Sequence, residues 1–204
     1  MIQLIDTTIT IFLRDIIPHN SFFNTIFSFL SLKGFSLAIW IVIIIFTTVI
    51  EEIHHPGIQK RDKRFIFYFI LTLCIQLIVV NYILKPLIHR SRPTSNLIYN
   101  VRTGRDLSLL RADHDLPLQI SIESCPADFS FPSGHAATAF TAAFVLSYFD
   151  KKRHWFYYII AVLISFSRIY LGCHYFFDVV FGGLLGSFIA WMTLKVKCPI
   201  IKKG

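Results

Sequence analysis

Charged residues are scarce in this sequence. Asp, Glu, Lys and Arg make up 16% of its 204 residues, against about 25% in an average soluble domain, and hydrophobic residues make up 54%. This composition excludes an ordinary water-soluble globular protein. Five stretches without a charged residue mostly approach the roughly 17–25 residues that cross a bilayer. They are 34–50, 65–84, 129–149, 155–167 and 179–194. We therefore expect an integral membrane protein with an all-α fold, a polytopic transmembrane helix bundle.

Linkers, repeats and cysteine motifs are also missing. No Pro-, Ser- or Gly-rich tract divides the chain, so residues 1–204 are expected to form a single membrane-embedded domain. The four cysteines lack the CxxC or Cys/His spacing of a zinc site, so no metal site is expected. Cys125 and Cys173 can pair if they lie on one side of the membrane, but the sequence favours free thiols.

Polar residues interrupt the first apolar region. Asp6, Arg14 and Asp15 would be costly at bilayer depth, so residues 2–31 are expected to form interfacial helices. About five spans follow, over 35–50, 65–84, 133–149, 155–171 and 177–194. A sixth span within residues 2–32 stays open.

Basic residues indicate the orientation. Segments 51–64 and 150–154 and the tail after Leu194 carry 11 of the 20 Lys and Arg residues, which is the cytoplasmic pattern. The C-terminus is therefore expected in the cytoplasm, and the cell (inner) membrane is the expected location. Lys85, Arg92 and Arg168 lie on the opposite side, where the orientation rule does not explain them.

Three motifs lie at the non-cytoplasmic ends of the expected spans: KPLIHRSRP (85–93), FPSGHAA (131–137) and SRIYLGCHYFFD (167–178). Lys85, Arg92 and Arg168 place three positive charges at about one membrane depth, and Arg side chains bind phosphate oxygens in a bidentate manner. Ser133 is a good helix N-cap, and Gly134 lets backbone N–H groups approach an anion. Together these residues predict a phosphate site.

Two histidines add chemistry to this site. His174 and Asp178 are four residues apart, so on a helix the carboxylate can accept one imidazole N–H and leave the other nitrogen free to attack. His135 is then available to protonate a leaving group and later to activate water. Each motif alone has a simpler interpretation, such as a snorkelling Arg or a packed His–Asp pair. Their coincidence at one membrane boundary favours function.

The spacing Lys85-x6-Arg92-Pro93, Pro132-Ser133-Gly134-His135 and Ser167-Arg168-x5-His174-x3-Asp178 resembles the three-part signature of the type 2 phosphatidic acid phosphatase superfamily, which includes the vanadium haloperoxidases. The resemblance covers about 64–194. It implies that His174 is the nucleophile, Asp178 its partner and His135 the general acid. It also implies metal-free, cofactor-free chemistry in which five residues hold the phosphoryl oxygens: Lys85, Arg92, Ser133, Gly134 and Arg168.

The expected function is hydrolysis of a lipid phosphate or diphosphate at the outer membrane face through a phosphohistidine. Undecaprenyl diphosphate is the favoured substrate, and phosphatidylglycerophosphate, phosphatidate and lipid A phosphates are the alternatives. A non-catalytic lipid-phosphate carrier is a further alternative, whereas haloperoxidases are soluble and fit poorly. The expected partners are the lipid substrate and the bilayer, without nucleic acid or an obligate protein partner.

Several other charged residues have no firm role in the sequence. Arg102, Arg105 and Arg111 in the long loop either contact an anionic head group or are surface charges. His89 and Arg90 lie inside the first motif without being fixed positions of the signature, and a place at the rim of the site is the expectation for them.

Overall fold

The structure is a computed structural model that describes residues 2–32, 35–54, 60–93, 125 and 128–195. Regular structure within these residues is entirely helical, which confirms the predicted fold class. The long loop with Arg102, Arg105 and Arg111, and the basic tail 196–204, lie outside the described residues. The helices are α1 (Ile2–Asp15), α2 (Ser21–Ser31), α3 (Phe35–His54), α4 (Lys60–Ile78), α5 (Lys85–Ile88), α7 (Gly134–Phe149), α8 (His154–Tyr170) and α9 (Phe176–Lys195).

The five predicted spans correspond to α3, to α4 with its continuation, and to α7, α8 and α9. A π-helical segment, Val79–Leu84, joins α4 to α5, so one continuous helix runs into the first motif. Among the described residues, Arg64–Ile88 and Phe176–Lys195 are long and apolar enough to cross a membrane, and Ala38–Thr47 is a shorter apolar helix. The number of spans remains a prediction.

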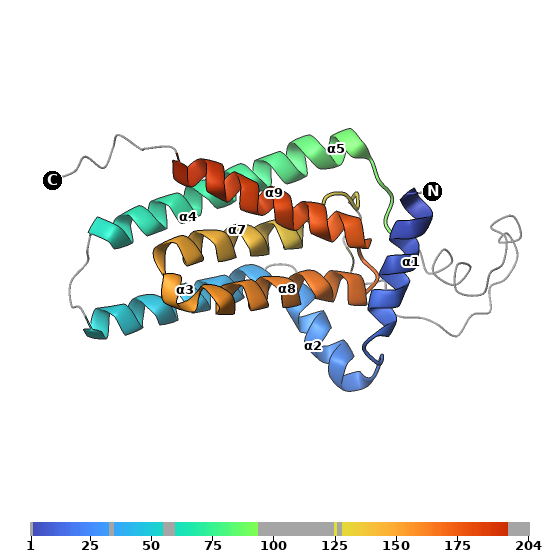
Figure 1. Ribbon diagram of the computed structural model, residues 1–204, viewed down its shortest axis with the longest axis horizontal. Coiled ribbons are helices and arrows are strands. Elements are labelled where there is room, and N and C mark those ends of the chain that lie inside the picture. Colours follow the sequence, from blue (N-terminus) through green and yellow to red (C-terminus); the bar gives the residue numbers. More distant parts are fainter. Residues whose placement is uncertain (1, 33–34, 55–59, 94–124, 126–127, 196–204) are drawn as a thin grey trace, which may run out of the picture.

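Helix α7 lies at the centre of the bundle and contacts α3, α4, α8 and α9 (Figure 1). Its inward positions carry small residues, including the fully buried Ala139, Ala142 and Ala143. Large side chains from the surrounding helices, such as Trp40 and Tyr157, fill the space beside them. Small residues on the central helix thus let its neighbours approach closely, as is common in membrane bundles.

Gly182 and Gly186 of α9 have the GxxxG spacing, which in a sequence favours close helix packing, and the structure confirms such packing. A Cβ atom on Gly182 would lie 2.5 Å from the carbonyl oxygen of Ser133, and one on Gly186 would collide with the carbonyl oxygen of Ala137. Any larger residue at either position would push α9 away from α7. The backbone contact begins at Ser133, so it holds the second motif against α9.

The outer surface of the bundle is apolar. Large hydrophobic side chains on several helices are more than half exposed, among them Phe46 of α3, Ile70 of α4 and Phe188 of α9. Soluble proteins rarely expose apolar surface on this scale. The exposed side chains therefore indicate that the bundle contacts lipid.

Helices α1 and α2 form where interfacial helices were predicted. The side chain of Asn20 caps α2 by accepting the N–H of Phe23 at 2.9 Å. At 14 and 11 residues, the two helices are about 21 and 17 Å long, too short to cross the roughly 30 Å hydrocarbon core singly. Helix α1 lies across the end of the bundle where α9 begins, opposite the end where the described part of α9 stops (Figure 1).

A disulfide joins Cys125 to Cys173, which corrects the expectation of free thiols. The sequence could not decide this pairing, because the two residues are 48 positions apart. The bond ties the segment before α7 to the turn that carries His174.

Candidate active site

The three motifs converge at the end of the bundle that α1 covers. The first motif reaches this position because α5 ends at His89, which adopts a left-handed conformation with φ 51°. Such a C-cap reverses the chain direction. Arg90 and Arg92 consequently extend from the end of the helix toward the turn between α8 and α9, where His174 lies.

Lys85 and Arg92 lie together, as predicted, and share an unexpected partner. One carboxylate oxygen of Asp128 accepts a hydrogen bond from Lys85 and the other accepts one from Arg92. Arg92 Nε also donates to the backbone oxygen of Asp128 at 2.9 Å. The two cations that were predicted to bind phosphate oxygens therefore bind the carboxylate of Asp128 instead.

Asp128 is ionised throughout the ordinary pH range. Partial burial opposes its charge, but the hydrogen bonds from Lys85 and Arg92 outweigh this effect and lower the pKa of the carboxyl group from 3.8 to about 2. The sequence indicated only that Asp128 lies in a polar loop. Its contact with two motif residues depends on the path of the backbone before α7.

Arg92 also contacts the predicted nucleophile. Its Nη1 lies 2.9 Å from Nε2 of His174 and donates to the carbonyl oxygen of Cys173 at 2.7 Å. Because a guanidinium group has only donors, Nε2 of His174 is the acceptor and carries no proton. The proton of the neutral ring therefore lies on Nδ1, on the side of Asp178.

The predicted His174–Asp178 pair is present with two differences. Helix α9 begins at Phe176, so His174 lies in the preceding turn rather than in the first turn of the helix. The Nδ1–Oδ2 separation is 3.6 Å, slightly longer than a hydrogen bond. Ser130, which the motif analysis missed, lies between them: its hydroxyl donates to Asp178 Oδ2 and lies 3.4 Å from His174 Nδ1.

His174 is neutral at physiological pH. Burial is the largest effect, and together with the charges of Arg92 and Arg168 it lowers the pKa of His174 from 6.5 to about 4, against the opposing effect of Asp178. A neutral imidazole with an unprotonated Nε2 is the form that can act as a nucleophile.

The second motif begins α7 as predicted. Ser133 is its N-cap, and the Ser133 side chain accepts the N–H of Ala136 at 3.5 Å. The backbone N–H of Ser133 is already used, because it donates to the carbonyl oxygen of Asp178 at 2.9 Å. A Cβ on Gly134 would make only ordinary contacts, the shortest 3.8 Å to Asn81. Neighbouring protein atoms therefore do not require glycine at this position.

His135 belongs to the same cluster. It lies in the first turn of α7. Four other predicted site residues are close enough to interact with it electrostatically: Arg168, His174, Lys85 and Arg92. The structure thus brings together both histidines and all three predicted cations.

Arg168 is completely buried near the end of α8. Its Nη1 donates to the carbonyl oxygen of Ser31 at 3.1 Å and to the hydroxyl of the same residue. Within the described part of the chain, its Nε and Nη2 have no hydrogen-bond partner. A buried guanidinium with unused donors beside Arg92 and Asp128 fits an oxyanion that binds here.

Asp6 is a further residue that the motif analysis missed, and Arg90, expected only at the rim of the site, contacts Asp178 directly. Arg90 donates to Asp178 Oδ1 at 2.5 Å and to Asp6 Oδ2 at 2.6 Å. Asp6 is fully buried, although the sequence indicated only an interfacial position for it. A charged residue within an otherwise apolar helix was the available signal.

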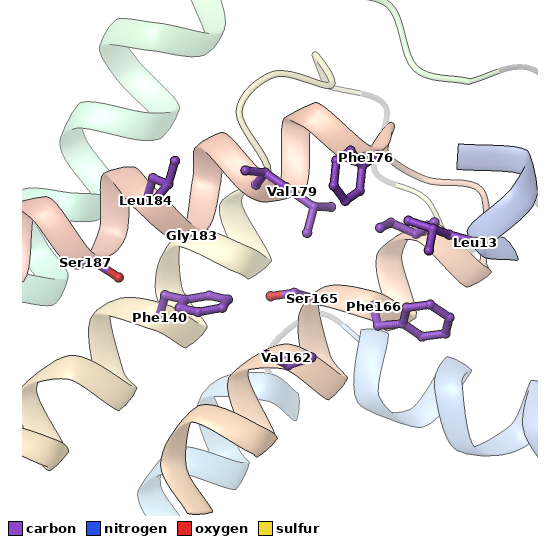
Figure 2. Close-up of a pocket in the computed structure, with 12 residues that line it drawn as sticks. Leu13, Phe140, Val162, Ser165, Phe166, Phe176, Val179, Gly183, Leu184 and Ser187 are labelled. Carbon is purple, nitrogen blue, oxygen red and sulfur yellow. The ribbon is translucent and has the colours of Figure 1, made fainter. Parts of the chain in front are cut away.

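An apolar cavity of about 410 Å³ is lined in part by Ile169, Phe176 and Val179, which lie within two positions of Arg168, His174 and Asp178 in the sequence. Figure 2 shows it between α8 and α9, with Phe140 of α7 and Leu13 of α1 at its sides. Phe176, two residues after His174, lines it, as do Val162 and Leu184. The last two side chains are 53% and 63% exposed, so the cavity opens onto the apolar outer surface.

The chain is similar in sequence to several known proteins. The chain is 43% identical over 77 residues to an undecaprenyl-diphosphatase of Sulfolobus acidocaldarius, over 37% of either chain. It is 31% identical over 130 residues to a lipid A 4'-phosphatase of Bacteroides thetaiotaomicron, over 60% of this chain and 49% of that relative. The matches therefore span less than half the length of these curated relatives.

The fold is similar to that of a protein of known structure. The crystal structure of Aquifex aeolicus LpxE matches 92% of this chain and 93% of its own with a TM-score of 0.59, at 23% identity. The sequence profile described as the PAP2 superfamily matches residues 65–198, a range that holds all three motifs. With a match over more than half of its length, the chain belongs to the PAP2 superfamily.

Proposed function

We propose that this protein is a metal-independent phosphatase that hydrolyses a lipid phosphate or diphosphate through a phosphohistidine at His174. The observation that carries the proposal is the state of His174: its Nε2 is unprotonated and faces Arg92, while its Nδ1 faces Ser130 and Asp178. This ring is oriented as a nucleophile. Arg92 contacts the ring, Arg168 lies near it, and Lys85 shares the carboxylate of Asp128 with Arg92. Such fixed cations provide the environment that a transferring phosphoryl group requires.

In the first step, Nε2 of His174 attacks the phosphorus atom. An N–P bond forms while the P–O bond to the leaving group breaks, and His135 gives a proton to the leaving oxygen. The proton on Nδ1 stays on the ring, and the carboxylate of Asp178 stabilises the resulting positive charge. Arg92, Arg168 and Lys85 stabilise the charge on the equatorial oxygens, which increases in the transition state.

In the second step, water attacks the phosphorus of the phosphohistidine. His135, which lost its proton in the first step, accepts a proton from this water as the N–P bond breaks. Inorganic phosphate leaves, and His174 returns to its neutral form. The fixed cations take the role that Mg²⁺ has in other phosphoryl transfers.

The proposed substrate is a lipid, with undecaprenyl diphosphate as the favoured one. The apolar cavity beside Phe176 supports this, because a chain attached to a phosphate at His174 can lie in it and leave through the mouth formed by Val162 and Leu184. The name of the Sulfolobus relative supports the diphosphate. The name of the Bacteroides relative keeps lipid A phosphates as an alternative.

We place the site on the non-cytoplasmic side of the cell membrane. The charge bias of the sequence supports this orientation. The Cys125–Cys173 disulfide beside the site supports it independently, because disulfides persist in oxidising compartments.

The test is phosphate release by the purified protein in detergent with excess chelator. Undecaprenyl diphosphate, phosphatidylglycerophosphate, phosphatidate and a lipid A phosphate are offered in parallel. We expect chelator-resistant release and an acid-labile ³²P-phosphoenzyme, both absent in His174→Ala. The matched control is His154→Ala, at an exposed histidine that contacts only the nearby backbone oxygen of Lys151 among the described residues. Labelling that survives His174→Ala would refute the mechanism, and binding without release from any lipid would favour a carrier.

A further inference from the structure

We propose that helix α1 is part of the catalytic apparatus: Asp6 and Arg90 are positioning residues that hold Asp178 in place behind His174. This inference rests on the proposed phosphatase function. Neither residue is a fixed position of the three-part signature, and Asp6 lies more than 160 positions from His174 in the sequence. Their connection to the site is visible only in the folded chain.

Asp6 connects two parts of the site. Its Oδ1 accepts the backbone N–H of Phe177, in the first turn of α9, at 2.9 Å, and its Oδ2 accepts from Arg90 at 2.6 Å. The side chain is fully buried. A helix N-terminus has N–H groups without partners inside the helix, and a carboxylate there is favourable. Asp6 therefore caps α9 from a different helix.

Thr10 extends the same contact by one turn of α1. Its hydroxyl donates to the carbonyl oxygen of Asp6 and accepts the N–H of Phe176 at 2.9 Å. The first two N–H groups of α9 thus both bind side chains of α1. Because α9 begins immediately after the catalytic turn, α1 fixes the position at which Asp178 projects.

Arg90 transmits this constraint to the carboxylate itself. It donates to Asp178 Oδ1 at 2.5 Å and to Asp6 at 2.6 Å, and its guanidinium lies 4.2 Å from the ring centre of Tyr175. The second oxygen of Asp178 accepts from Ser130 and from the N–H of Tyr175. With Oδ1 held by Arg90, only Oδ2 faces His174 Nδ1.

Removing this constraint should affect turnover more than binding. Asp178 contacts the ring that attacks, whereas Lys85, Arg92 and Arg168 surround the oxyanion and do not contact Asp6. Misplacement of a catalytic group by about 1 Å can reduce the rate roughly a hundredfold. We therefore expect Asp6→Asn and Arg90→Ala to lower kcat about ten- to hundredfold with KM nearly unchanged.

A second cavity, beside Asp6 and Arg90, allows the role of Arg90 to be tested by chemical rescue. About 540 Å³ of space lies against Asp6, Arg90, Ser91 and Phe131, so a small cation can enter from this side. In Arg90→Ala, millimolar methylguanidinium should restore part of kcat because it can donate to both carboxylates. Tetramethylammonium has the same charge without N–H donors, and it should restore nothing.

Thr10→Val and Thr8→Val form a matched pair of variants. Both hydroxyls bond the carbonyl four residues earlier, but Thr8 is exposed and only Thr10 accepts an N–H of α9. With rates normalised to folded protein, we expect kcat to fall in Thr10→Val alone. We expect Asp6→Asn combined with Arg90→Ala to be no slower than the slower single variant, because both act through Asp178.

Three outcomes would overturn the inference. They are an unchanged kcat in Asp6→Asn and Arg90→Ala, equal losses in Thr10→Val and Thr8→Val, and rescue by tetramethylammonium as strong as by methylguanidinium. In each case wild-type turnover leaves the proposed function intact. Absence of wild-type turnover with every lipid offered would instead overturn the proposed function, and the positioning role with it.

Discussion

Nη1 of Arg92 lies 2.9 Å from Nε2 of His174, so the lone pair proposed to attack phosphorus accepts a hydrogen bond from Arg92. A nitrogen in this state cannot attack until the bond breaks. Under the proposed mechanism, we expect the phosphoryl oxygens of the substrate to draw Arg92 away from His174 and so free Nε2 for attack.

Arg92→Lys should be a poor substitute although it keeps the positive charge. Arg92 donates simultaneously to Asp128, to Cys173 O and to His174, and Lys cannot reproduce this planar geometry. Loss of one or two charge-assisted hydrogen bonds corresponds to about a ten- to hundredfold lower kcat/KM. Arg153→Lys at the other end of the bundle, where Arg153 pairs with Asp150, should keep kcat/KM near the wild-type value. Equal activity of the two variants would contradict the bidentate role.

Asp128→Asn should tighten inhibition by inorganic phosphate. The Asp128 carboxylate forms ion pairs with Lys85 and Arg92, so an incoming oxyanion competes with it for these two cations. A partly exposed ion pair is worth up to about 1 kcal/mol, which predicts an inhibition constant up to roughly fivefold lower. The pKa of Asp128 is about 2, so this difference should be constant from pH 5 to pH 8. Weaker inhibition in the variant would mean that Asp128 organises the cations for substrate instead.

The acid limb of kcat/KM should lie near pH 4. Because the pKa of His174 is lowered to about 4, the nucleophile stays neutral as the pH falls through 6.5. The folded protein binds this proton less readily than the unfolded chain, so stability should fall as the pH drops from about 6.5 toward 4. Lipid monophosphates and diphosphates titrate differently, so a limb common to both belongs to the enzyme. A common limb between pH 6 and 7 would refute the lowered pKa.

Ser165→Leu should discriminate between long and short lipid chains. Ser165 is buried at the cavity wall, where its side chain and that of Phe140 point toward one another (Figure 2). A larger side chain there excludes part of a bound tail, and each excluded methylene loses about 0.8 kcal/mol. We expect kcat/KM for a long-chain substrate to fall about tenfold or more, with a short-chain phosphate unaffected. An equal loss for both substrates would indicate a general packing defect.

The helices and the motif residues were predictable from the sequence because their signals are local. Apolar runs, the Ser133 cap and the spacing of Gly182 and Gly186 each depend on residues close together in the chain, and the structure confirms them. The convergence of Lys85, Arg92, His135, Arg168 and His174 was expected because each lies near the same end of a span.

The remaining partners of the site could not be predicted in this way. Asp128 and Ser130 reach the cations and His174 through an irregular segment before α7, whose path has no periodic signal. Asp6 is 172 positions from Asp178 in the sequence, and the two are linked through Arg90. Arg90 has no fixed place in the signature. Contacts of this kind depend on how the end of the bundle closes, which local spacing does not encode.

The backbone contact between α7 and α9 also limits which parts of the molecule can move relative to one another. Because a Cβ atom on Gly182 or Gly186 would collide with backbone atoms of Ser133 or Ala137, α7 and α9 pack backbone against backbone, and we expect His135 and Asp178 to keep a nearly constant separation during the reaction. We therefore expect the movements that admit substrate and release product to occur outside this pair, in the segment 128–131 and in Arg92.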